Sequence, residues 1–180
     1  MKAKITFNEY RLWVIFNQTH HLIAKCSENA LSKAGSTDQQ YLMLWIMQFM
    51  AEVNGGLITI TDLAPILYHN VNTVSSMIDR MEKKGLVEKI RDLADRRSIR
   101  LKITPKGEEV FSNASKPSRE LIKRLFSVFS DEELATLISL MKKLKTKISE
   151  ELGIEDVKSN PDLNDPARII SFLNKWNAEH

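Results

Sequence analysis

One stretch of the chain, Thr59–Gly107, places helical and strand periodicity side by side, and it constrains the fold more than any other part of the sequence. It begins with two short segments of helical periodicity, at residues 60–68 and 71–84. Thr59 and Asn70 are suited to cap these helices, because a side-chain oxygen at the N-cap accepts a hydrogen bond from the first turn. Since the segments almost touch in sequence, only a tight turn can join them. We therefore predict a helix–turn–helix unit.

Apolar and polar residues then alternate at 86–91 and 99–104, which is the period of a strand with one buried face. The residues between them, 92–98, are largely charged, so we predict a β-hairpin with a charged turn. We expect its outward residues to include Glu88, Lys89, Arg91, Arg100 and Lys102. The predicted fold class is mainly α with a small β-hairpin wing (α+β): a winged helix–turn–helix head plus a helical dimerisation region.

Helical segments at 8–31 and 106–128 surround this unit, and a capping-box pattern at Ser130 opens a further helix with coiled-coil-like apolar spacing. A monomer would expose these apolar faces as large patches, so we expect a homodimer. The predicted organisation is an N-terminal dimerisation helix at 1–35, the winged helix–turn–helix domain at 36–105, C-terminal dimerisation helices at 106–153, and a linker with an extra helix at 154–180.

Two more helices complete the prediction. A capping-box pattern at Thr37 precedes the segment Tyr41–Met50, which is apolar nearly all round and is therefore expected to be buried. The last helix, at 166–177, is expected to pack its apolar side onto the dimerisation region, through Ile169, Leu173 and Trp176.

The residue types of the helix–turn–helix unit and hairpin suit double-stranded DNA. The second helix fits a major groove, where short polar side chains at its N-terminus would meet base edges and phosphates. Guanidinium groups at the hairpin turn can enter a minor groove, which has a negative potential. The net charge of +3 is compatible with this partner without indicating it. The predicted DNA-binding residues are Asn70, Asn72, Thr73, Ser75, Ser76, Arg80, Arg91, Arg96 and Arg97.

The sequence resembles the MarR family of transcriptional regulators in the following motifs: DRRSIRLKITPKG at 95–107 in the hairpin, and LA at 63–64, TVS at 73–75 and DRMEKKGLV at 79–87 in the helix–turn–helix. The resemblance implies a homodimer on a pseudo-palindromic operator, with Asp95 orienting the wing and Arg97 in the minor groove. It also implies a repressor released by a small aromatic or anionic effector, with an activator as the alternative.

Three residues depart from the family pattern. Tyr68 stands where a turn glycine is common, so the turn needs either a positive φ or a different geometry. His69 replaces an apolar residue, and Ser76 replaces an arginine, which leaves the operator sequence open. A winged-helix module that binds protein instead of DNA is the second hypothesis, and the retained Arg96 and Arg97 count against it. An enzyme is the third, and we find no catalytic motif and expect no cofactor.

Residues of the helices outside the helix–turn–helix unit and hairpin are candidates for an effector, metal or thiol site. Trp13, Phe16, His20 and Trp45 are candidates to line an effector cavity, although packed core residues are the alternative. His20 and His21 are adjacent on a helix and point about 100° apart, so we expect no metal site. Cys26 is the single cysteine and is expected to be a packed thiol rather than a sensor. Without a signal sequence or an apolar run of membrane-spanning length, we expect a cytoplasmic protein.

Overall fold

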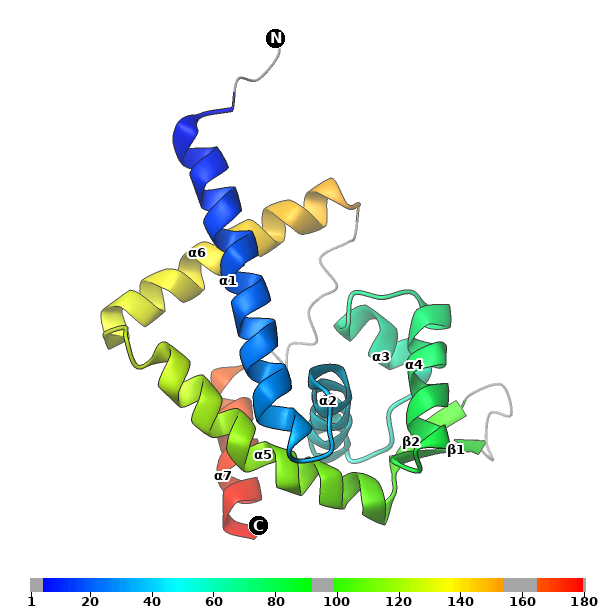
Figure 1. Cartoon of the computed structure of the whole chain (residues 1–180). Helices are drawn as coiled ribbons and strands as arrows, with labels where there is room; N and C mark the ends of the chain where they lie inside the picture. Colours follow the sequence, from blue (N-terminus) through cyan, green and yellow to red (C-terminus); the bar gives the residue numbers. More distant parts are fainter. Residues whose placement is uncertain (1–4, 92–98, 154–164, 180) are drawn as a thin grey trace.

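A computed structural model describes residues 5–91, 99–153 and 165–179. Within these ranges the chain forms seven helices and one two-stranded antiparallel sheet, which confirms the predicted fold class (Figure 1). The elements are α1 (Phe7–Ser32), α2 (Asp38–Asn54), α3 (Ile60–Ile66), α4 (Val71–Lys83), β1 (Val87–Arg91), β2 (Ile99–Ile103), α5 (Pro105–Phe126), α6 (Asp131–Glu151) and α7 (Pro166–Glu179).

Capping residues fix where these helices begin. The capping boxes predicted at Thr37 and Ser130 are confirmed, and Thr6 and Thr59 form two more. In each box the hydroxyl of the capping residue accepts a hydrogen bond from the backbone amide of the third helical residue. The side chain of that third residue in turn accepts from the backbone amide of the capping residue. These reciprocal bonds satisfy backbone N–H groups that the first turn of a helix leaves unpaired. The short α3, which contains Pro65 in its last turn, therefore has a defined start.

The core of the head lies between α2, α3, α4 and the wing. Leu44, Phe49, Leu63, Val74 and Ile78 are fully buried there, and Leu101 of β2 closes the core from the sheet. Most of the residues of the segment 41–50 are buried, which confirms the prediction from its nearly continuous apolar run. The amide of Leu101 also donates to the Ile58 carbonyl at 2.8 Å, which joins the wing to the start of α3.

The last helix packs onto the head, and the prediction that it would pack on the dimerisation region is wrong. Phe172 is only 3% exposed and meets the rings of Trp45 and Phe49 edge-on, with centroids 5.9 and 5.5 Å away. Lys175 adds an ion pair with Glu52 at 3.1 Å. Sequence periodicity shows that α7 has an apolar side, but it does not show which surface will cover it.

Helices α1, α5 and α6 extend to one side of the head, with α1 crossing α6 in this view (Figure 1). These three helices carry most of the large apolar side chains that the structure leaves exposed. Among them are Phe7, Trp13 and Leu22 on α1, Ile122 and Phe126 on α5, and Ile138, Leu140, Leu144 and Ile148 on α6. Surfaces of this kind are typical of association between chains.

Candidate nucleic-acid interface

Helix α4 has one buried face and one polar face. Val74, Met77, Ile78 and Met81 are buried against the head core. On the other side, Asn72, Ser76 and Arg80 follow one another at intervals of four residues and are all exposed, while Thr73 and Ser75 are half-buried at the edges. The polar residues predicted to meet DNA are therefore arranged as a stripe along the outer surface of α4, except Asn70, which precedes the helix.

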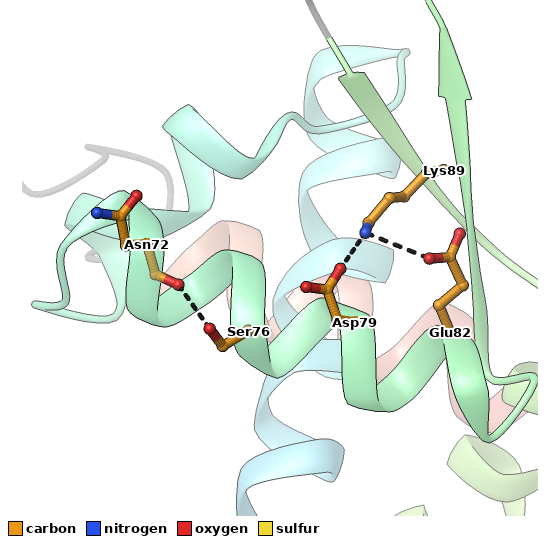
Figure 2. Close-up of polar contacts among 5 residues, drawn as sticks. All are labelled: Asn72, Ser76, Asp79, Glu82 and Lys89. Carbon is orange, nitrogen blue, oxygen red and sulfur yellow. Dashed lines mark hydrogen bonds and ion pairs between the residues drawn. The ribbon is translucent and has the colours of Figure 1, made fainter.

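Two of the predicted DNA-binding residues form local hydrogen bonds, one at the N-cap of α4 and one inside the helix. The Asn70 side chain accepts from the Thr73 amide at 2.8 Å, which is the N-cap bond expected from the sequence. The Ser76 hydroxyl donates to the Asn72 carbonyl at 3.0 Å (Figure 2). Because this bond uses the Ser76 proton, the hydroxyl oxygen is left to act as an acceptor. The positive end of the α4 dipole favours a phosphate near its N-terminus.

The turn between α3 and α4 contains Tyr68 in the left-handed region, with φ of 53°. Of the two geometries left open by the sequence, this is the positive-φ turn. The Tyr68 amide donates to the Pro65 carbonyl at 3.1 Å, and the His69 amide donates to Ala64 at 3.0 Å. These bonds close the turn around Tyr68. For a non-glycine residue, the left-handed conformation is about 1–2 kcal/mol higher in free energy than the right-handed one.

The wing differs from the prediction at two residues, because Lys89 and Arg100 do not point outward. Lys89 forms ion pairs with Asp79 and Glu82 of α4 (Figure 2). Arg100 donates to the Leu57 carbonyl at 3.0 Å. Strand alternation could have corrected the first error, since adjacent Glu88 and Lys89 cannot both face outward.

The wing residues that were predicted to bind DNA lie at or beyond the end of β1. Arg91 is exposed there, and pairs in register with Ile99. Asp95, Arg96 and Arg97 lie outside the described residues, so their predicted roles stay predictions.

The base of the wing is held by a compact set of bonds. The Thr104 hydroxyl donates to the Gly85 carbonyl at 2.6 Å and accepts from the Gly107 amide at 3.1 Å. The Thr104 amide donates to the Leu86 carbonyl at 3.1 Å, and the Lys106 ammonium donates to the carbonyl of Lys84, the C-cap of α4. One threonine thus ties the end of α4, the sheet and the start of α5 together.

A cavity of about 280 Å³ lies between α1, the Tyr68 turn and α6. Its lining is mostly apolar, and Lys145 places its ammonium 5.4 Å from the centre of the Tyr68 ring. The lining residues are Phe16, Tyr68, Met141, Leu144, Lys145, Ile148, Ser149 and Leu152. Of these, only Phe16 was among the effector residues predicted from the sequence, because nothing in the pattern shows that α6 returns beside the turn.

The structure does not bring the four predicted effector residues together. Trp45 stacks on Phe49 in the head, with Phe172 against its edge, as in the packed-core alternative. Trp13 is 64% exposed, and His20 is exposed on α1 with His21 beside it. In the described ranges no cluster of three or more His, Cys, Asp or Glu side chains is arranged to hold a metal ion. Nor is any described helix long and apolar enough for a membrane span.

Comparison with known proteins gives consistent matches. Residues 37–99 match the model of the MarR family. A Bacillus subtilis protein named uncharacterized HTH-type transcriptional regulator YsmB is 32% identical over 130 residues, which cover 70% of this chain and 86% of that protein.

Solved structures match most of the chain. An organohalide-sensing transcriptional regulator with 2,4-dichlorophenol bound has a TM-score of 0.68 at 25% identity, over 82% of this chain and 87% of that one. A mutant of MarR from Escherichia coli complexed with operator DNA has a TM-score of 0.67 at 24% identity, over 78% and 99% of the two chains. At 24% identity, this second match shows only that the two proteins share a fold.

Proposed function

Since this chain belongs to the MarR family of helix–turn–helix transcriptional regulators, we propose that it is a homodimeric repressor that binds a pseudo-palindromic operator and is released by a small molecule. The observation that carries the proposal is the exposed polar stripe of α4, followed by a basic wing. On this proposal Asn72 and Ser76 meet base edges, and Arg80 meets the phosphate backbone.

The test begins with duplexes selected by the protein from a random-sequence pool. Asn72→Ala should weaken binding to the selected duplex by about tenfold or more, because one base contact contributes about 1–3 kcal/mol. Asn113→Ala is the matched control, because it removes the same side chain from an exposed position on α5. Failure to select any preferred sequence, or equal binding by both variants, would reject the assignment of α4 as the reading element.

Dimerisation is supported by the exposed apolar side chains on α1, α5 and α6. A second copy of the chain is the occupant we propose for these faces, because two heads are needed to read two half-sites. Sedimentation equilibrium should give twice the chain mass of 20.7 kDa at micromolar concentration. A mass of one chain under those conditions would contradict the dimer.

The effector site that we propose is the cavity beside Tyr68. Its apolar lining suits an aromatic body, and Lys145 supplies a cation for a phenolate or carboxylate. The regulator that matches at 25% identity has 2,4-dichlorophenol bound, which is a molecule of this class. Tyr68 belongs both to the cavity lining and to the turn before the Asn70 cap, so a ligand that moves its ring would act directly on the start of α4.

Release can be measured with 2,4-dichlorophenol as the probe. It should weaken DNA binding by the wild type, and Leu144→Trp, which fills the cavity, should remove this response. Ser139→Trp is the control, since Ser139 is exposed on the same helix, is absent from that lining and is not one of the apolar side chains assigned to the dimer. A response that survives Leu144→Trp unchanged would place the effector elsewhere.

A further inference from the structure

Lys89 forms the polar connection between the recognition helix and the wing that Figure 2 shows. Its ammonium donates to an Asp79 carboxylate oxygen and lies 3.2 Å from a Glu82 carboxylate oxygen. The Lys89 side chain is 23% exposed, against 48% for Asp79 and 43% for Glu82, so the lysine is the more enclosed partner. None of the DNA contacts predicted from the sequence includes these three residues.

Strand register explains why a lysine is found in this place. Lys89 pairs with Leu101, which is 1% exposed and faces the core, so both side chains emerge on the inner face of the hairpin. The aliphatic stem of Lys89 can cover apolar surface there while its ammonium reaches the outside of α4. Asp79 and Glu82 are three residues apart on α4 and therefore lie on one side of it, where they receive the same cation.

The Lys89 ammonium is charged at neutral pH. The hydrogen bond to Asp79 raises the pKa of Lys89 above its ordinary value, with Glu82 acting in the same direction and partial burial against it. A raised lysine pKa means that folding favours the charged form of Lys89. The resulting contribution to stability is lost only as the pH rises through the pKa of Lys89 in the folded protein. The link is thus a constant feature at neutral pH.

The link gives the hairpin a second attachment to α4. The first is at its base, where the Leu86 amide donates to the Met81 carbonyl at 3.0 Å. Strand β2 is bonded to the segment before α3, through Leu101 to Ile58 and through Arg100 to Leu57, but neither of these bonds reaches α4. A further attachment at Lys89, three residues along, sets the direction in which β1 leaves α4.

We propose that Lys89 is a positioning residue, which holds the wing at the angle to α4 that lets both elements enter their grooves on one DNA duplex. This inference rests on the proposed DNA-binding function. The two reading elements must fit a duplex of fixed groove spacing, so a wing whose angle to α4 varies loses part of its specific contacts. Non-specific binding follows the total charge and not the angle.

The test compares binding to the selected duplex with binding to a scrambled duplex of the same length. Lys89→Met should lower the ratio of the two affinities by about three- to tenfold, since it removes two partly exposed ion pairs. Lys89→Arg keeps the charge and should restore most of the ratio. Lys102→Met is the matched control: it removes one positive charge from the same hairpin, but its partner, Glu88, lies on that hairpin too. Its ratio should stay within about twofold of the wild type.

A second variant separates positioning from simple charge. Asp79→Asn combined with Glu82→Gln takes two negative charges off α4, so it should tighten binding to scrambled DNA. If Lys89 acts by positioning, the same variant lowers the preference for the selected duplex, and amide exchange in β1 becomes faster. An unchanged preference in this variant and in Lys89→Met would overturn the inference, and so would an equal loss in Lys102→Met. The wild type's own preference for the selected duplex reports separately on the proposed function.

Discussion

Gly107 is the position where adding a single methyl group should disturb the wing most. It lies in the first turn of α5 and is buried against the base of the wing. A Cβ atom there would be 2.0 Å from the Leu86 carbonyl oxygen and 2.7 Å from Cγ2 of Ile103. Ordinary C···O contacts are about 3.3 Å or longer, so α5 and the sheet would have to separate by more than about 1 Å.

The cost follows from which atoms are in contact. The Leu86 oxygen belongs to the backbone and already accepts from the Thr104 amide, so it cannot rotate away. Overpacking of this kind costs about 1–3 kcal/mol, against a gain of up to about 1 kcal/mol from the smaller entropy of an unfolded chain with alanine. We expect Gly107→Ala to lower the free energy of unfolding by about 2 kcal/mol, measured by urea denaturation at a fixed protein concentration.

Gly56→Ala provides the control, because a Cβ at Gly56 meets nothing within 4 Å and its φ is outside the left-handed region. Its free energy of unfolding should stay within about 0.5 kcal/mol of the wild type. If Gly107→Ala proved as stable as Gly56→Ala, the close approach of α5 to the wing base would be refuted, and with it the account of how Thr104 anchors the hairpin.

Other predictions concern α7, the α4 cap and the turn. Phe172→Ala should lower the free energy of unfolding by about 3 kcal/mol, because the ring is buried against Trp45 and Phe49; urea unfolding followed by tryptophan fluorescence measures it. Ile170→Ala, which truncates an exposed side chain of α7, is the control. A loss in Phe172→Ala no larger than in this control would mean that α7 is not docked. Asn70→Ala should cost about 1 kcal/mol through loss of the cap, and an unchanged melting temperature would argue against the bond to Thr73. Tyr68→Gly should keep the fold, since glycine adopts the turn's φ without strain, but should abolish the response to 2,4-dichlorophenol if the ring transmits it.

Local signals in the sequence predicted most of the fold. Thr37, Thr59, Asn70 and Ser130 mark helix starts through bonds that involve only their own first turns, so no tertiary information is needed to find them. Strand alternation likewise gave the hairpin at 86–104. These features depend on residues three or four apart, or two apart in a strand, and the sequence displays such spacings directly.

Long-range placement could not be predicted in the same way. The apolar side of α7 was evident, but its target on α2 is more than a hundred residues away in the chain, and several apolar surfaces compete for it. Lys145 beside Tyr68 is a similar case, because helical spacing says nothing about which turn α6 will approach. Lys89 is different, since its inward direction follows from the register with Leu101 once the pairing of the strands is known.

The central claim is that two copies of α4 and the wing read one duplex, and the selected DNA tests it most directly. We predict that selection by the wild-type protein converges on an inverted repeat with half-site centres about 10 base pairs apart, bound by two chains, and that affinity falls steeply with added salt. Arg80→Ala should reduce the slope of log affinity against log salt by about one. A selected sequence without two-fold symmetry, bound by a single chain with little dependence on salt, would contradict the account.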